Sequence, residues 1–109
     1  MATSYKVLGQ VAPSATTDTT VYTVPSATEA VVSTIIIANR AASPGTFRLS
    51  VRPNGAAIAD QHYLAYDVPI AAKDSTTLTL GLTLEATDVI TFYASSANMS
   101  INVSGSEIS

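Results

Sequence analysis

Leucine alternates with small or polar residues in the segment TLTLGLTL, which spans residues 77–84. Successive side chains of a strand point to opposite faces of a sheet, so this segment has one leucine face and one polar face. An antiparallel sheet that packs on a core with one side and meets water with the other has this pattern. We therefore expect the four leucines, Leu78, Leu80, Leu82 and Leu84, to point into a core. Four residues from other segments are expected to join them there: Ile36, Leu49, Val51 and Ile90.

The same period of two recurs along the chain and predicts eight strands. Thr, Val, Ile and Tyr, which favour strands, dominate these segments, and helix signals are nearly absent. The apolar run at residues 35–37, in the longest segment, indicates a central strand that is buried on both faces. The predicted strands are residues 5–10, 19–24, 30–39, 46–52, 61–68, 76–84, 89–94 and 99–103.

Turn residues separate the predicted strands. The segment RAASPG at residues 40–45 ends in Pro-Gly and predicts a hairpin, and Pro-Asn-Gly at residues 53–55 predicts a turn with a positive φ. Many short strands with turns at this spacing are typical of an antiparallel sandwich or barrel. We expect an all-β protein, with residues 1–109 forming a single antiparallel β-sandwich of about eight strands, either jelly-roll or immunoglobulin-like.

The composition is poor in charge. Of the 109 residues, 47% are hydrophobic and 12% are charged, which is about half the charged share of ordinary soluble domains. One interpretation is a compact β domain whose surface is coated with Thr and Ser. The other is that much of the surface lies against copies of the same chain or a partner, and we favour it because monomers usually carry more charge.

The charge and the apolar runs exclude several partners. A net charge of −3, with scattered basic residues, argues against nucleic acid, whose phosphates need clustered Lys and Arg. The longest apolar run, Ile35 to Ala38, is far too short to cross a bilayer, so we expect no membrane. The chain has no Cys and shows no signal-peptide pattern, which fits assembly in a reducing cytoplasm.

Candidate catalytic and metal-binding residues are few. The single histidine, His62, has Asp60 and Asp67 nearby in sequence but no nucleophile motif, so we interpret it as structural and expect no catalytic residues. Asp60, Asp67, Asp74 and Asp88 lack the spacing of a calcium loop. Aspartates beside turns more often accept hydrogen bonds from turn amides, and we expect no metal site and no cofactor.

Five residues are candidates for a protein interface. Tyrosines on a strand could form a sugar platform, but a place in the core or at an interface fits them better, because Tyr often lies half-buried with its hydroxyl in water. The arginines could bind carboxylates of a partner chain or could pair with acidic residues on the neighbouring strand. These candidates are Arg40, Arg48, Arg52, Tyr63 and Tyr66.

Several segments carry a resemblance to a known family. They are EAVVSTIIIANR at residues 29–40, FRLSVRPNGAA at 47–57, HYLAYDVPI at 62–70, LGLTL at 80–84 and GSEI at 105–108. In these segments, and so over most of its length, the chain resembles small all-β structural proteins encoded among the virion genes of tailed bacteriophages, including phages of cyanobacteria. The shared motifs are those of packing and turns, and the resemblance brings no catalytic residues.

The resemblance implies a non-enzymatic virion protein, and we expect a capsid decoration (cement) protein that oligomerises and stabilises the shell. It also implies a homo-oligomer, with a trimer favoured, that binds the major capsid protein or other virion proteins. The expected location is the virion, assembled in the cytoplasm of the bacterial host. The alternatives are a baseplate, neck or fibre component, or a carbohydrate- or receptor-binding β-sandwich module.

Overall fold

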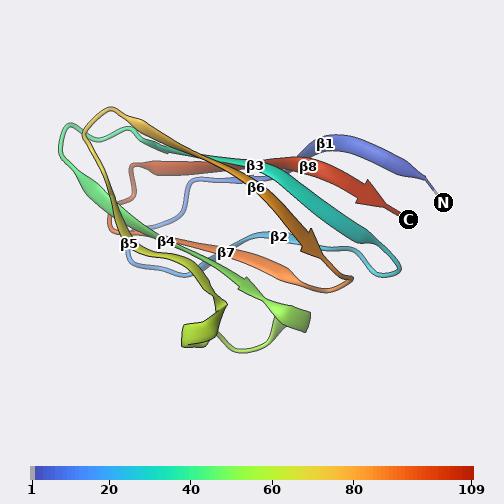
Figure 1. Ribbon diagram of the computed structural model, residues 1–109. Coiled ribbons are helices and arrows are strands. Elements are labelled where there is room, and N and C mark those ends of the chain that lie inside the picture. Colours follow the sequence, from blue (N-terminus) through green and yellow to red (C-terminus); the bar gives the residue numbers. More distant parts are fainter. Residues whose placement is uncertain (1) are drawn as a thin grey trace.

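Two four-stranded antiparallel sheets face each other in the computed structural model, which describes residues 2–109 (Figure 1). The predicted eight-stranded β-sandwich is confirmed. Sheet A contains, in spatial order, β1 (Thr3–Val11), β8 (Met99–Ile108), β3 (Glu29–Asn39) and β6 (Ser75–Leu84). Sheet B contains β2 (Thr19–Thr23), β7 (Val89–Ala94), β4 (Gly45–Arg52) and β5 (Tyr63–Ile70). Two 3-10 turns, η1 (Pro53–Gly55) and η2 (Asp60–His62), lie between β4 and β5.

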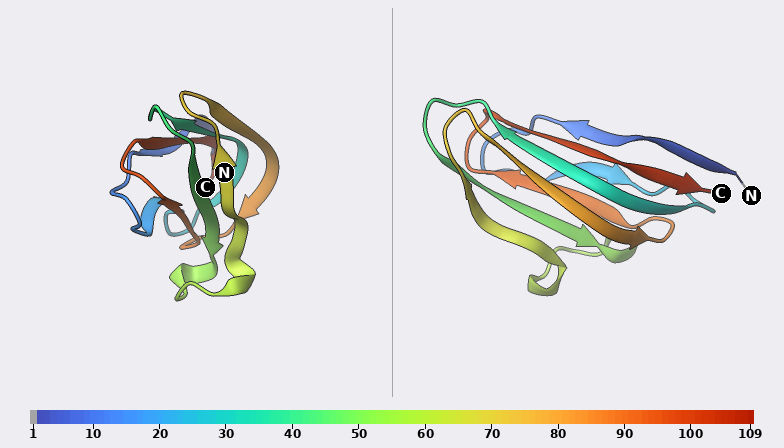
Figure 2. Two further views of the ribbon diagram at one scale, coloured as in Figure 1. Left: turned by 90° about the vertical axis from the view of Figure 1, so that its left-hand side faces the viewer. Right: turned by 45° about the horizontal axis from the view of Figure 1, so that its top comes forward.

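The strand order identifies the type of sandwich. The chain passes from one sheet to the other at every connection except β4 to β5, which gives the orders β1-β8-β3-β6 and β2-β7-β4-β5. Figure 2 shows these crossings at both ends of the molecule. Eight strands wound between two sheets in this order form a jelly roll rather than an immunoglobulin-like sandwich. The hairpin predicted at residues 40–45 is therefore wrong, because that segment crosses from β3 in sheet A to β4 in sheet B.

The core lies between the sheets and is mostly as predicted. Leu49, Ile90 and Leu84 are buried, and Val51 packs at the edge of the core. The other three leucines of β6 are only partly buried because β6 is an edge strand with a single neighbour. They are Leu78, Leu80 and Leu82.

Ile36 is a correction to the predicted core. Its neighbours Ile35 and Ile37 are fully buried, whereas 42% of Ile36 is exposed on the outer face of sheet A. The strand β3 is central in its sheet but is covered on one face only, because the jelly roll has two layers. A continuous apolar run therefore does not mean burial on both faces here.

Strand boundaries also differ from the prediction at several ends, by one or two residues at most of them and by more at the end of β8. β8 continues to Ile108, because its Ser- and Gly-rich end pairs with β1 on one side and β3 on the other. The chain ends extend this pairing through two hydrogen bonds between Ala2 and Ser109. β5 begins at Tyr63, because the preceding residues form η2, in which the His62 amide donates to the Ala59 carbonyl.

A polar bridge that contains Tyr22, Glu107 and Lys6 links the two sheets. The Tyr22 hydroxyl of sheet B donates to Glu107 Oε2 of sheet A at 2.5 Å, and Lys6 Nζ lies 2.6 Å from Glu107 Oε1. Lys6, and then the Tyr22 hydroxyl, lower the pKa of Glu107, while burial and this hydrogen bond raise the pKa of Tyr22. Over residues 2–109, no helix has the length and apolar character needed to cross a membrane.

Candidate functional site

An arginine lies between two tyrosine rings on the outer face of sheet B. Arg48 of β4 lies opposite Tyr93 of β7 in the register, and β5 brings Tyr66 to its other side. The guanidinium carbon lies 4.2 Å from the ring centre of Tyr66 and 4.3 Å from that of Tyr93. Arginine above an aromatic face gains from both the ring quadrupole and planar stacking. We call Arg48, Tyr63, Tyr66, Asp67 and Tyr93 the Arg48 cluster.

An acidic residue completes the Arg48 cluster. Arg48 Nε donates to Asp67 Oδ1 at 2.7 Å, and Asp67 stands at a shift in the β4–β5 register with a positive φ of 52°. The hydrogen bond to Asp67 raises the pKa of Arg48 above its usual range. Of the two sequence interpretations of this arginine, pairing with an acid on the neighbouring strand is the one found. Arg48 is therefore already paired within its own chain.

The two predicted interface tyrosines, Tyr63 and Tyr66, are in contact. The rings of Tyr63 and Tyr66 meet edge to face at right angles, with their centres 4.9 Å apart, because the register shifts in β5 bring both rings together. They line a hollow of about 300 Å³ together with Asp60, and 55% of Tyr66 is exposed. Burial raises the pKa of Tyr63, so its phenol stays neutral at ordinary pH. An exposed ring can stack on an apolar face of a ligand, and a carboxylate beside it can accept hydrogen bonds from the ligand's hydroxyls.

Arg52 lies on the same outer face and holds the end of η1 in place. Its Nε donates to Thr91 Oγ1 at 3.1 Å, and its Nη1 donates to the Ala56 carbonyl at 3.0 Å. Next to it is a hollow of about 220 Å³ that Asp18 and Ile58 also line. Arg52 thus stabilises the connection between β4 and β5.

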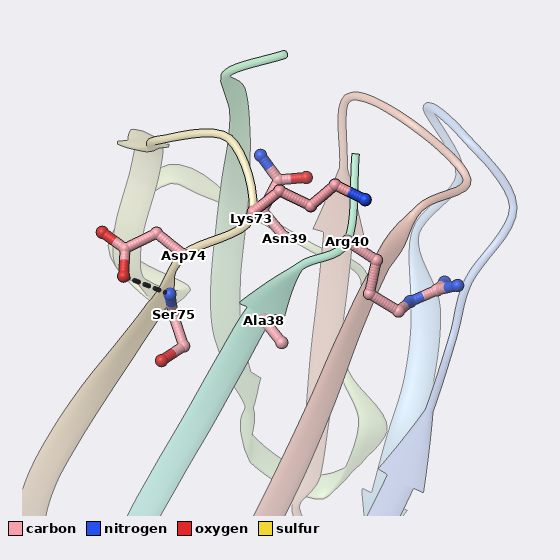
Figure 3. A pocket seen from close by; sticks show the side chains of 6 residues that line it. All are labelled: Ala38, Asn39, Arg40, Lys73, Asp74 and Ser75. Carbon is pink, nitrogen blue, oxygen red and sulfur yellow. Dashed lines mark hydrogen bonds between the residues drawn. The ribbon is translucent and has the colours of Figure 1, made fainter. Parts of the chain in front are cut away.

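Arg40 lies far from the Arg48 cluster, at the end of the sandwich where three connections meet (Figure 3). A hollow of about 410 Å³ there has Arg40, Lys73 and Asp74 in its lining. Buried Asn39 holds this end together, since its Nδ2 lies within hydrogen-bonding distance of the carbonyls of Ser43 and Ile70. Arg40 itself donates to the carbonyl of Ala97 at 3.2 Å. The structure therefore groups four of the five predicted interface residues on one face and separates the fifth.

The outer face of sheet A is a surface that the sequence patterns did not single out. It exposes 85% of Tyr5 and 54% of Val7, beside a hollow of about 370 Å³. Val7 and Leu8 are adjacent apolar residues and so break the alternation. The β1–β8 register shifts at this point. Two apolar neighbours in a strand are a signal that one of them is exposed. Cross-strand neighbours share a face, and three rows across the sheet contain no charged residue. The rows are Tyr5–Ser106–Val31–Thr83, Val7–Ser104–Thr34–Thr79 and Gln10–Asn102–Ile36–Thr77.

Four of the residues weighed for catalysis and metal binding have structural partners: His62, Asp67, Asp74 and Asp88. His62 Nδ1 accepts the Ala59 amide at 3.1 Å. Asp88 accepts the amides of Asn54 and Glu85, each at 2.9 Å, as expected for an aspartate beside a turn. Within the described part of the chain, no group of three or more His, Cys, Asp or Glu side chains could hold a metal ion.

No family model and no curated protein matches this chain. The surfaces of the molecule therefore provide the structural evidence on function. The two that stand out are the Arg48 cluster on sheet B, which is rich in charged and aromatic groups, and the uncharged rows on sheet A.

Proposed function

We propose that this protein is a non-enzymatic virion structural protein, a decoration protein that oligomerises on an assembled phage capsid and stabilises the shell. The observation that carries the proposal is the outer face of sheet A, where Tyr5, Val7 and Ile36 are exposed among uncharged Ser, Thr and Asn side chains. Contiguous exposed apolar surface marks interaction sites, and Tyr5 and Val7 are neighbours on one face of β1 that line the same hollow. The sequence resemblance supplies the identity of the partner, the major capsid protein or another virion protein.

The physical role follows from linkage. A protein that binds the assembled shell but not its separated subunits adds its binding free energy to the stability of the shell. A two-layered sandwich suits this role, because backbone hydrogen bonds join the four strands of each sheet and the two sheets share one core. A homo-oligomer multiplies the contacts with the shell, and a trimer is the number that the resemblance implies.

Purified particles test this proposal directly. We expect mass spectrometry to find the protein in intact virions, and calorimetry to show that shells lacking it open at a lower temperature. Tyr5→Ser combined with Val7→Ser is expected to fold normally and to lose binding to shells, whereas Thr23→Ser on sheet B is expected to bind like the wild type. Absence of the protein from purified virions would overturn the proposal. Presence in tails instead of capsids would favour the baseplate, neck or fibre alternative.

Saccharide binding is a second candidate function, supported by one specific observation. The exposed Tyr66 ring, set at right angles to Tyr63 beside Asp60, lines a hollow of about 300 Å³ on sheet B. Sugars stack on such rings and donate hydroxyl hydrogens to carboxylates. In NMR titrations with monosaccharides, binding would shift signals of Tyr63 and Tyr66 and be lost in Tyr66→Ala but not in Tyr5→Ala. Unchanged spectra throughout would remove this candidate.

A further inference from the structure

Two cations stand at one end of the outer face of sheet A. Beyond the three uncharged rows, Ser100 of β8, Ala38 of β3 and Ser75 of β6 lie side by side and add a fourth row without charge. Arg40 follows this row along the chain from β3, and Lys73 precedes it on the way into β6. A hollow of about 410 Å³ is lined by both cations together with Ala38 and Ser75. The cations therefore border the face that the proposed function assigns to docking.

Backbone hydrogen bonds hold the two cations beside each other. The Asn39 amide donates to the Asp74 carbonyl at 2.8 Å, and the Lys73 amide donates to the Ala41 carbonyl at 3.0 Å. The side chain of Asn39 is buried and fixes the same end of the sandwich from inside. Figure 3 shows the Lys73 side chain reaching across the end of β3 to the side on which Arg40 stands. The frame of this site is thus set by the fold.

Neither cation is neutralised by an acid of its own chain. The ion pairs within residues 2–109 involve other cations, those of Lys6 and Arg48. Arg40 donates to the carbonyl of Ala97 at 3.2 Å, which leaves its charge in place. Like charges beside each other repel, so a carboxylate that lies between Arg40 and Lys73 gains from both of them.

The acid next to Lys73 in the sequence does not fill this role. The carboxylate of Asp74 points away from the Lys73 ammonium in Figure 3 and accepts the amide of Ser75 at 2.8 Å. An aspartate that accepts a backbone amide beside a turn stabilises the turn. The cations of the hollow are therefore left for an anion from outside the molecule.

The opposite end of the same face carries the opposite charge. Ala30 of β3 pairs with Leu84 of β6, and the next residues outward are Glu29 and Glu85. Both glutamates are exposed, because their neighbours Ala30 and Leu84 point into the core. An acidic surface is attracted to the Arg40 end of this face and repelled from the Glu29 end, which gives docking one preferred direction.

We propose that Arg40 and Lys73 form a carboxylate-binding site at the rim of the outer face of sheet A, and that its ligand is an acidic segment of the shell protein that covers this face. The planar guanidinium of Arg40 matches a carboxylate with two parallel hydrogen bonds, and the Lys73 ammonium adds a second positive charge. The net charge of −3 disfavours nucleic acid, the other common polyanion.

The carboxylate chemistry of the site rests on Arg40 and Lys73, whereas the source of the carboxylates rests on the proposed function. Charges at the rim of an interface set its orientation and association rate more than its affinity. The kind of partner that fits is therefore a neutral surface with an acidic segment at one side.

An NMR titration of the purified protein with a tetraglutamate peptide tests the site without shells. We expect the signals of Arg40, Lys73 and Ser75 to shift at low salt and the shifts to fade at high salt, while a tetraglutamine peptide shifts none of them. Lys73→Gln is expected to raise the dissociation constant of tetraglutamate roughly tenfold. Thr23→Glu, which changes the net charge by the same amount on sheet B, is the matched control and is expected to bind like the wild type.

Two results of the titration would overturn the site. One is the absence of shifts at Arg40 and Lys73, and the other is an equal loss of binding in Lys73→Gln and Thr23→Glu. Inorganic phosphate that shifts the same signals at lower concentration than tetraglutamate would overturn the assignment to carboxylates.

Shell binding distinguishes this site from the proposed function. Arg40→Gln combined with Lys73→Gln is expected to slow association with shells roughly tenfold at low salt and to approach the wild type at high salt. A double variant that binds as fast as the wild type at every salt concentration would overturn the shell as the source of the carboxylates and leave the docking role of sheet A standing. A wild type that does not bind shells would overturn the proposed function, and the peptide titration would still decide the site.

Discussion

The two outer faces of this sandwich share one core and differ in almost everything else. On sheet B, Arg48 is paired with Asp67 and stacked on two tyrosines, while η1 contacts β7 and η2 contacts β4. Ser50 and Thr91, which point away from the core, are buried on that face. On sheet A, three complete cross-strand rows contain no charge and nothing in the described chain covers them.

The difference shows how a chain with few charges distributes them. The charged groups on the outer face of sheet B bond within the molecule. Arg48 pairs with Asp67, and Arg52 binds carbonyls of the segment at residues 53–62, so fewer of these groups are free to bind a partner. Sheet A keeps neutral side chains, which lose little hydration free energy when another protein covers them. The uncharged outer face of sheet A is thus better suited to docking than the charged and aromatic outer face of sheet B.

The largest effect is expected where a single step along β3 changes the face. Ile37→Ala is expected to lower the free energy of unfolding by about 2–5 kcal/mol, because it leaves a cavity in the core. Ile36→Ala, the adjacent residue on the outer face, is expected to change it by less than about 0.5 kcal/mol. Urea denaturation measures both. Similar losses in the two variants would show that the outer face of sheet A is not free.

The strands could be predicted because alternation is a local signal. Which face of β3 is buried could not be predicted from the local sequence. Ile35, Ile36 and Ile37 are chemically identical, and only the two-layer topology decides which one is exposed. Likewise, the contact of Tyr63 with Tyr66 depends on register shifts that a regular strand would not have. The sequence pointed to Arg48 and Tyr66 as interface candidates, but the stacking of Arg48 on Tyr66 and Tyr93, which joins three strands, is a tertiary property.

The bridge between the two sheets is expected to produce an intermediate, pH-dependent effect. The pKa of Glu107 is lowered by Lys6 and Tyr22, so its stabilising contribution is present above the unfolded pKa, about 4.3, and is lost as pH falls through the folded pKa. Glu107→Gln is expected to melt at a lower temperature at neutral pH and to lose less stability than the wild type on acidification. Parallel melting curves for both proteins at every pH would contradict this role.

A smaller effect is expected from conservative change in the Arg48 cluster. Arg48→Lys keeps the charge but loses the planar stacking on Tyr66 and Tyr93 and the forked contact with Asp67. We expect a lower melting temperature, while Arg40→Lys, whose side chain makes a single hydrogen bond to a carbonyl, is expected to melt like the wild type. Calorimetry compares the two. Equal melting temperatures would show that the cluster does not stabilise sheet B.

Hydroxyl-radical footprinting of side chains, on the free protein and on protein bound to shells, tests most directly whether the outer face of sheet A is the docking face. Tyr5 on that face and Tyr66 on sheet B are both exposed in the free protein and are expected to react. We predict that binding to shells protects Tyr5 and leaves the reactivity of Tyr66 unchanged. Binding that leaves Tyr5 reactive and instead protects Tyr66 would contradict the account.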